Sequence, residues 1–209
     1  YNVKKRPLNN PIICHFANLK RIKKDFHLNK LEELIAKKIW PGPITLILRK
    51  RNESKISNLV SNKSSYIGCR IPKNKIALQL LKSLHFPIAA PSANFSERAS
   101  VTKFEDLDKN LIKKIFAIKG GQSKLGLEST VIKVKKNYIE VLRLGSITPS
   151  DILKVANKSK IKFISKSKIS PGNLKKHYAT KKKIRINVKK VKNDEGLINF
   201  GKNKLKSKI

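Results

Sequence analysis

The sequence predicts an α/β fold with a mixed sheet. Short apolar runs, typical of buried strands, alternate with segments whose apolar residues recur every three or four positions, as in amphipathic helices. Strands that alternate with helices indicate parallel pairing. By contrast, Ser129–Val134 and Tyr138–Leu142, which flank Lys136-Asn137, are typical of an antiparallel hairpin. With 209 residues, 39% of them hydrophobic, the chain suffices for one medium-sized domain or for one domain and part of another.

Each expected strand is a short apolar run bounded by turn residues or by charged residues. Before the hairpin these runs are Pro11–Phe16, Ile44–Leu48, Tyr66–Arg70, Pro87–Ala90 and Ile115–Ile118. The last two of them stop at Pro91 and just before Gly120-Gly121, respectively, and both kinds of residue interrupt strands.

Four segments show helical spacing of apolar residues or a helix-start signal. They are Asn29–Ile39, Asn74–Leu84, the weaker Glu105–Lys114, and Thr148–Asn157. In the last, Thr148 is expected as the N-cap and Pro149 at the first helical position. Trp40–Pro43 ends the first helix, and Arg49–Ser65 is expected to be a loop with some helix.

The pattern of the chain changes near Asn157, which predicts a domain organisation. Residues 1–157 are expected to form one domain. Residues 158–183 show no sustained period and contain Ser170-Pro171-Gly172, so they are predicted to be a linker. Residues 184–209 are expected to begin a further domain, with strands over Ile184–Val191 and Leu197–Phe200.

The net charge of +36, from 49 basic and 13 acidic residues, favours a polyanionic partner. Only eight of the basic residues are Arg, although Arg is the preferred bidentate phosphate ligand. Lys is spread over the whole length, as a general compositional bias would also produce. Both interpretations of the charge stay open at this point.

The remaining composition indicates a cytoplasmic protein. Cys14 and Cys69 fall inside expected strands and have no metal-binding spacing, so they are predicted to be buried free thiols. No run of about 18 apolar residues predicts a membrane span, and the start has no apolar segment typical of a signal peptide. Because the chain lacks Met and opens at Tyr1, we expect it to be truncated at the N-terminus. Because it stops just after an expected strand, we expect truncation at the C-terminus as well.

Four groups of residues have the composition of a ligand site, although each is also typical of an ordinary turn, loop, core or surface. The Pro87 strand runs into Pro91-Ser92-Ala93-Asn94, where small residues let the backbone approach a ligand. Lys4-Lys5-Arg6 precedes the first strand and suits a polyphosphate. By strand alternation His15 and Arg70 point away from Cys14 and Cys69; if they share a cavity, they can hold a carboxylate. The glycine-bearing stretch 119–130 leads into Ser129-Thr130 but is not a Walker loop.

In combination and order, these stretches resemble the threonylcarbamoyl-AMP synthase family, whose catalytic unit is the YrdC-type domain. The resemblance covers about Tyr1–Ala156. It rests on Lys4–Pro7 with Asn10–His15, Trp40–Leu46, Arg70–Pro72, Ala90–Asn94, Gly126–Val131 and Leu142–Thr148. A further block, Ser170–Gly172 with His177–Ala179, is similar to the interdomain linker of the long, two-domain members.

The resemblance implies an open twisted mixed sheet with helices around a concave cavity, followed by a linker and the start of a small Rossmann-like C-terminal domain. It implies a nucleotidyltransferase that makes threonylcarbamoyl-AMP and pyrophosphate from L-threonine, bicarbonate and ATP. This product serves threonylcarbamoyladenosine modification of tRNA. Mg²⁺ is expected on the triphosphate, with no dedicated protein ligands for it. The expected partners are tRNA or the downstream threonylcarbamoyl transferase complex, and not a membrane.

The resemblance also implies roles for individual residues. Lys4 and Arg6 are expected to be catalytic. The residues expected to bind ATP are Lys4, Arg6, Asn10, Ser92, Asn94, Ser100, Arg143 and Tyr178. Those expected to bind threonine are His15, Arg70 and Ser129. Tyr178 is expected to help close the cavity against water.

The chain departs from the family pattern at several points, and other functions stay open. The threonine-bearing segment upstream of Lys4 is absent, and Tyr66 stands where Thr is usual. Leu144 and Thr180 stand where Pro is usual, and Ser96-Glu97 replaces the common Ser-Gly. One alternative is a double-stranded RNA or tRNA-binding module without its own chemistry. Another is a carbamoyl-adenylate enzyme with a different acceptor, since related domains use carbamoyl phosphate.

Overall fold

A computed structural model of the chain describes residues 1–96, 98–157, 160–163 and 183–198. The chain divides into two units, Tyr1–Tyr178 and Ala179–Ile209, and each is considered by itself. The helices and strands named below all belong to the first unit.

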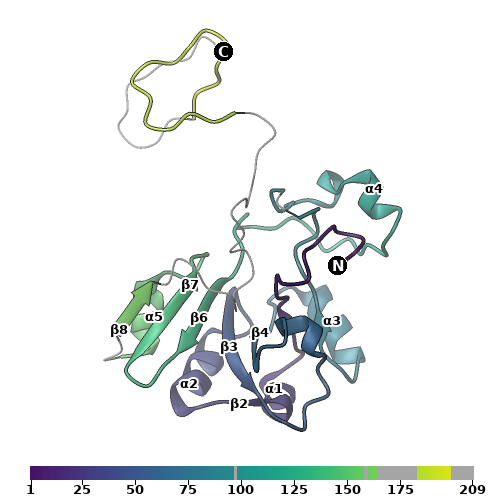
Figure 1. The fold of residues 1–209 in the computed structure, drawn as a ribbon, viewed down its shortest axis with the longest axis vertical. Helices are drawn as coiled ribbons and strands as arrows, with labels where there is room; N and C mark the ends of the chain where they lie inside the picture. Colours follow the sequence, from purple (N-terminus) through teal and green to yellow (C-terminus); the bar gives the residue numbers. More distant parts are fainter. Residues whose placement is uncertain (97, 158–159, 164–182, 199–209) are drawn as a thin grey trace. The chain divides into compact units, whose positions relative to one another are not determined.

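The first unit is built on an eight-stranded mixed sheet, which confirms the predicted fold class (Figure 1). Its strands are β1 (Cys14–His15), β2 (Phe26–His27), β3 (Ile44–Lys50), β4 (Tyr66–Arg70), β5 (Ile88–Ala89), β6 (Thr130–Val134), β7 (Tyr138–Arg143) and β8 (Lys160–Phe163). Their order is β5-β1-β4-β3-β6-β7-β8, and β2 also pairs with β3. The pairs β1–β4, β3–β6 and β7–β8 are parallel. The predicted hairpin is the antiparallel pair β6–β7.

Side-chain caps fix the starts of the main helices. The helices are α1 (Leu19–Asp25), α2 (Lys30–Ile39), α3 (Lys75–Ser83), α4 (Lys109–Ile112) and α5 (Pro149–Val155), with 3₁₀ turns at Asn58–Ser61 and Phe104–Asp106. At α2, Asn29 and Glu32 each accept the other's backbone N–H. At α5, Thr148 and Asp151 do the same ahead of Pro149 at N1, which confirms the predicted cap. Such caps satisfy N–H groups that have no partner inside the helix.

Strand alternation gives the sheet one apolar face and one partly polar face. In β3, Ile44, Leu46 and Leu48 belong to the main core, whereas Thr45 and Ile47 point to the other side. Helices α2 and α5 contact each other on the core face (Figure 1). The largest buried side chains of that core include Phe16, Ile22, Phe26, Ile35, Ile132 and Ile152. Each such side chain contributes about 1.5–3 kcal/mol on burial, so the core face holds the sheet together and the other face is free to carry polar groups.

The predicted strand Ile115–Ile118 is wrong. The structure has no strand there, and Phe116 is fully exposed. An apolar run of four residues forms a strand only where the fold places a hydrogen-bonding neighbour beside it. The predicted helix over Glu105–Lys114 is present only as the turn Phe104–Asp106 and the single helical turn α4.

Three elements of the structure were not expected from the sequence: α1, β2 and β8. In α1 the buried Ile22 is surrounded by Lys and Arg, which hides the apolar period. Strand β8 lies within the predicted linker and pairs in parallel with β7. Among residues 183–198 the structure has no strand, so the strand predicted over Ile184–Val191 is wrong, as is the described part of Leu197–Phe200. The domain boundaries themselves stay a prediction.

The two cysteines are buried free thiols, as predicted. Cys14 and Cys69 are neighbours in the register of β1 and β4. Burial raises the pKa of the Cys14 thiol to about 12, so this thiol stays protonated and unreactive at neutral pH. Within the described ranges, no helix is long and apolar enough to cross a membrane.

Gly145 allows the chain after β7 to lie directly against residues 128–130. A Cβ at this position would lie 2.2 Å from the Glu128 carbonyl oxygen and 2.5 Å from the Thr130 nitrogen. We therefore expect Gly145→Ala to lower the free energy of unfolding by about 2 kcal/mol or more, the usual cost of overpacking against backbone.

Gly120→Ala is the matched control, because the nearest atom to its Cβ would be Asn74 Nδ2 at 3.6 Å. Its effect on the free energy of unfolding should stay within about 0.5 kcal/mol. Urea titration of both variants measures the free energy of unfolding. Equal values for the two variants would show that residues 128–130 move to accept the added Cβ without loss of stability.

Candidate active site

A cavity of about 310 Å³ opens on the polar face of the sheet. Seven of the residues predicted to bind ligands line it: Arg6, His15, Arg70, Ser92, Ser100, Ser129 and Arg143. They come from the N-terminal turn, from β1, β4 and β7, and from the loops that follow β5 and precede β6. Residues predicted from separate sequence blocks are thus brought together around one space.

The pairing of β1 with β4 brings His15 and Arg70 together. The two strands are parallel and in register, with Cys14 beside Cys69 and His15 beside Arg70. Cys14 and Cys69 belong to the core, whereas His15 and Arg70 line the cavity, which confirms that the pairs point to opposite faces. Arg70 Nε donates to the Gly42 carbonyl oxygen at 3.0 Å, so the loop after α2 holds the guanidinium in place.

Burial makes His15 a neutral side chain. Desolvation, together with the nearby positive charge of Arg70, lowers the pKa of His15 to about 4. Its Nδ1 is buried and has no hydrogen-bond partner among the described residues. At neutral pH this imidazole can therefore give or accept a hydrogen bond with a ligand without adding charge.

Lys4 joins the N-terminal cationic turn to the serine-bearing loop. Its Nζ donates to the Ser92 carbonyl oxygen, and its own carbonyl oxygen accepts from the Ser96 N–H at 3.1 Å. Burial, and then the charge of Arg6, lower the pKa of Lys4 to about 8. An anion placed beside this amine would favour its charged form, so the turn is suited to receive negative charge.

Arg6 is held by the residues that lead into β1. Its Nη2 donates to Asn10 Oδ1 at 2.7 Å and to the Pro11 carbonyl oxygen at 2.5 Å, and its Nε donates to the Asn10 carbonyl oxygen at 3.2 Å. Asn10 is buried and is not among the lining residues. In this structure Asn10 therefore orients Arg6 and does not face the cavity.

Asn94 likewise contacts its own loop. Its Nδ2 donates to the carbonyl oxygens of Phe95 at 2.9 Å and Arg98 at 2.7 Å. The residue is buried and does not line the cavity. Its Oδ1 is buried without a partner among the described residues. Asn94 thus fixes the loop that presents Ser92. Tyr178, also predicted to bind ATP, lies outside the described residues.

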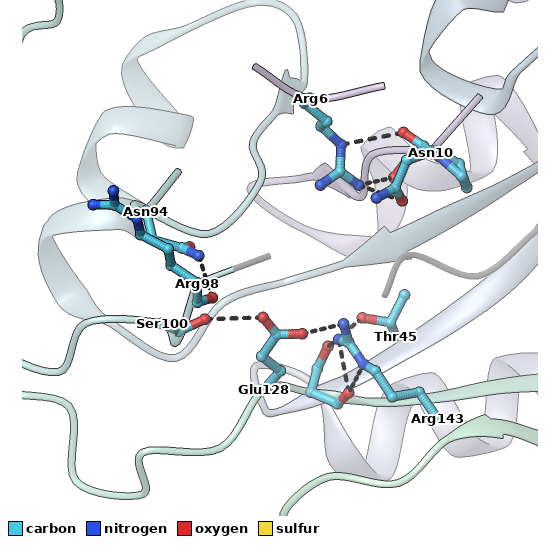
Figure 2. A network of polar contacts seen from close by, with 10 residues as sticks. Arg6, Asn10, Thr45, Asn94, Arg98, Ser100, Glu128 and Arg143 are labelled. Atoms are coloured by element: carbon cyan, nitrogen blue, oxygen red, sulfur yellow. Dashed lines mark hydrogen bonds and ion pairs between the residues drawn. The ribbon is translucent and has the colours of Figure 1, made fainter. Parts of the chain in front are cut away.

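A polar network links the two sides of the cavity (Figure 2). Arg143 forms an ion pair with Glu128. Its Nη2 donates to the carbonyl oxygen of Ser129 at 2.9 Å and to Ser129 Oγ at 3.0 Å. Ser129 Oγ also shares a hydrogen bond of 2.8 Å with Thr45 Oγ1, while Ser100 Oγ donates to Glu128 Oε1 at 3.0 Å. Ser100 and Arg143 were predicted on the nucleotide side and Ser129 on the threonine side, so the network spans both.

Sequence reasoning missed the polar lining residues Thr102, Ser123 and Glu128, and also Thr45, which contacts Ser129. Glu128 and Thr45 are the two that take part in the polar network. Both lie inside blocks that carried the resemblance, but neither has a periodic or spacing signal of its own. The available clue for Glu128 was that it is the one acidic residue in those blocks. Thr45 sits in an apolar strand, where a threonine is common for its β-branch.

The charge of the cavity suits a polyanion. Three arginines line it, and Lys4 lies beside Ser92, one of the lining residues. Desolvation lowers the pKa of Arg6 and of Arg70, because burial disfavours their charged forms. No group of three His, Cys, Asp or Glu side chains gathers in the part of the chain that the structure describes. The arrangement can bind and orient an anion, but it provides no Ser-His-Asp nucleophile.

The depressed pKa of His15 predicts a loss of stability in acid. The unfolded chain takes up a proton near pH 6.5, whereas folded His15 does so only near pH 4. Between these values the unfolded state binds more protons, so the free energy of unfolding falls as the pH falls, by about 3 kcal/mol for this group. Urea titrations from pH 7 to pH 4 should show this.

His15→Gln removes the titrating group, so its stability should fall less than that of the wild type over the same range. His27 is exposed, and His27→Gln should follow the wild-type curve. Parallel curves for His15→Gln and wild type would contradict the assignment.

Comparison with known proteins gives consistent matches. A family model named for Sua5, YciO and YrdC, and described as "Telomere recombination", matches residues 1–145. A threonylcarbamoyl-AMP synthase of Pyrococcus abyssi is 33% identical, and the match covers 86% of this chain and 54% of that protein. A threonylcarbamoyl-AMP synthase of Bacillus subtilis is 34% identical over 86% of this chain and 53% of that protein. The chain thus spans about half the length of these relatives.

The fold agrees with a solved structure as well. The crystal structure of P. abyssi Sua5 in complex with L-threonine matches with a TM-score of 0.76 at 33% identity. This match covers 85% of the present chain and 54% of the other. Because the family model spans well over half of the chain and the sheet follows the solved relative, the chain belongs to the Sua5/YciO/YrdC family.

Proposed function

We propose that this chain carries the site that converts L-threonine, bicarbonate and ATP into threonylcarbamoyl-AMP and pyrophosphate. The observation that carries the proposal is that one cavity is lined by His15 and Arg70 together with Arg6, Ser92, Ser100 and Arg143. His15 and Arg70 are suited to a carboxylate, and the arginines and serines beside them are suited to phosphate groups. This combination fits an amino acid and a nucleoside triphosphate held side by side. The names of the relatives from P. abyssi and B. subtilis support the same activity.

On the amino-acid side, Arg70 would bind the threonine carboxylate with its planar guanidinium. Neutral His15 would add a hydrogen bond, and Ser129, tied to Thr45, would offer a hydroxyl. The relative whose structure was solved as a complex with L-threonine supports this substrate.

On the nucleotide side, Lys4, Arg6 and Arg143 would contact the phosphates, with hydroxyls from Ser92 and Ser100. Asn10 and Asn94, first expected to bind ATP themselves, would instead hold Arg6 and the Ser92 loop in position. Tyr178 stays a predicted contact. Mg²⁺, which fits best on the triphosphate because the described residues offer no carboxylate cluster, would neutralise phosphate charge.

The proposed chemistry needs positioning and charge stabilisation more than a nucleophilic side chain. The amine of threonine forms a C–N bond to carbon dioxide and releases a proton, or reacts with bicarbonate and releases water, and either route gives a carbamate. A carbamate oxygen then attacks the α-phosphorus of ATP, the bond to the β-phosphate oxygen breaks, and pyrophosphate leaves. Lysine and arginine beside the phosphates stabilise the charge that develops, while the cavity holds the two substrates in contact. The product would be passed to a transferase that modifies adenosine in tRNA.

The central test is pyrophosphate release from ATP by the purified protein. With bicarbonate present, we expect release to depend on L-threonine, and mass spectrometry should detect threonylcarbamoyl-AMP. L-Valine, which has the shape of threonine but no hydroxyl, should support much less release, because hydroxyl partners in the site would then lack a ligand.

Two other results of this assay would each indicate one of the alternative functions. Release that needs carbamoyl phosphate and not threonine would indicate a carbamoyl-adenylate enzyme with another acceptor. Salt-dependent binding of tRNA without any ATP-dependent chemistry would indicate an RNA-binding module.

Arg70→Lys should raise the KM for threonine much more than the KM for ATP. Lysine keeps the charge but loses the planar fork, so KM for threonine should rise by roughly 10-fold or more, whereas KM for ATP should change by less than about 3-fold. Arg51→Lys is a matched control, since Arg51 pairs with Glu53 outside the cavity. Steady-state kinetics measures both constants, and equal loss for the two substrates would point to a structural role for Arg70.

A further inference from the structure

Glu128 is the one acidic side chain among the described residues that line the cavity. It lies between Ser100 and Arg143 in the network of Figure 2. Its negative charge also acts on Lys4, Arg6 and Arg70, whose pKa values it raises against the effect of burial. One carboxylate therefore serves as counter-charge to the cations on both sides of the site.

The contacts of Glu128 fix the position of two residues proposed for the nucleotide. One carboxylate oxygen pairs with Arg143 Nη1, and the other accepts from Ser100 Oγ at 3.0 Å. Arg143 is held from its other edge by Ser129, at 3.1 Å from Nε to the carbonyl oxygen and 2.9 Å from Nη2. Glu128 and Ser129 together leave the guanidinium one orientation.

The ion pair is shielded from water, which strengthens the attraction between its two charges. The side chains of Arg143 and Glu128 are 14% and 18% exposed, respectively. Charge-assisted hydrogen bonds in such surroundings are short and directional, and loss of one partner leaves the other poorly compensated. Glu128 thus contacts the Arg143 guanidinium directly, in surroundings with little water, and can hold it in one orientation.

We propose that Glu128 is a positioning residue that orients Arg143 and Ser100 for the attack on the α-phosphorus, and that its negative charge at the same time weakens the binding of polyphosphate. This inference rests on the proposed function for its first part. Its second part follows from charge alone. A residue with this double role favours turnover over tight binding of the nucleotide and of pyrophosphate.

Two substitutions distinguish the effect of the length of the Glu128 side chain from the effect of its negative charge. Glu128→Gln removes the charge while keeping the length, so Arg143 loses its ion pair. Pyrophosphate should then bind about 3- to 10-fold more tightly because a repelling charge is gone, whereas kcat should fall about 10- to 100-fold because Arg143 is misplaced. Glu128→Asp keeps the charge but cannot bridge both partners, so pyrophosphate affinity should stay near that of the wild type while kcat falls.

The experiment combines calorimetric titration with inorganic pyrophosphate at pH 7, steady-state kinetics and thermal unfolding. Glu140→Gln is the matched control, because Glu140 is a partly buried glutamate paired with Lys135 on the β6–β7 hairpin and does not line the cavity. It should leave both pyrophosphate affinity and kcat unchanged. A purely structural role of Glu128 would weaken pyrophosphate binding and turnover together.

Weaker pyrophosphate binding by Glu128→Gln, or an unchanged kcat in that variant, would overturn the inference. If Glu128→Gln does not fold, Glu128→Asp decides it, since unchanged kcat there contradicts a need for the bridge. If the wild type binds pyrophosphate but shows no threonine-dependent turnover, the proposed function fails, and the effect of charge is still decided by the titration.

Discussion

The in-register parallel pairing of β1 with β4 is the interaction on which the site depends. It places Cys14 beside Cys69 on the core face and His15 beside Arg70 on the cavity face. Because side chains alternate along a strand, a shift of one residue in either strand would turn His15 or Arg70 into the core and the neighbouring thiol toward the cavity. The apolar packing of α2 and α5 against the sheet therefore also fixes the chemistry of its opposite face.

The burial of positively charged side chains is the second physical constraint on the site. Burial lowers the pKa of Lys4, Arg6 and Arg70, because their charged forms lose part of their hydration in the folded protein. Backbone carbonyl oxygens at Ser92, Pro11 and Gly42 accept their hydrogen bonds and keep them in place. A polyanionic ligand would favour their charged forms, so under the proposed function the groups whose burial costs stability would also bind phosphate.

Local signals and tertiary contacts contributed differently to what could be predicted. The cap of α5 follows from residues within one helical turn, so the sequence alone locates it. The run Ile115–Ile118 has the composition of a strand but no sheet neighbour, and α1 hides its single buried Ile22 among basic residues. Hydrogen-bond partners and solvent shielding come from distant segments, and a linear pattern does not contain them.

The sequence by itself determined the α/β class and the hairpin, because both rest on alternation and spacing. The seven predicted residues that line the cavity came from the resemblance to a known family, which itself rests on short motifs. The tertiary structure alone decided which of the motif residues face the cavity. Asn10 and Asn94 belong to the motif blocks, yet they bind Arg6 and the Ser92 loop, since the turns that carry them aim their amides at backbone and guanidinium. It also decided the role of Glu128, whose meaning depends on Ser100 and Arg143, 28 and 15 residues away along the chain.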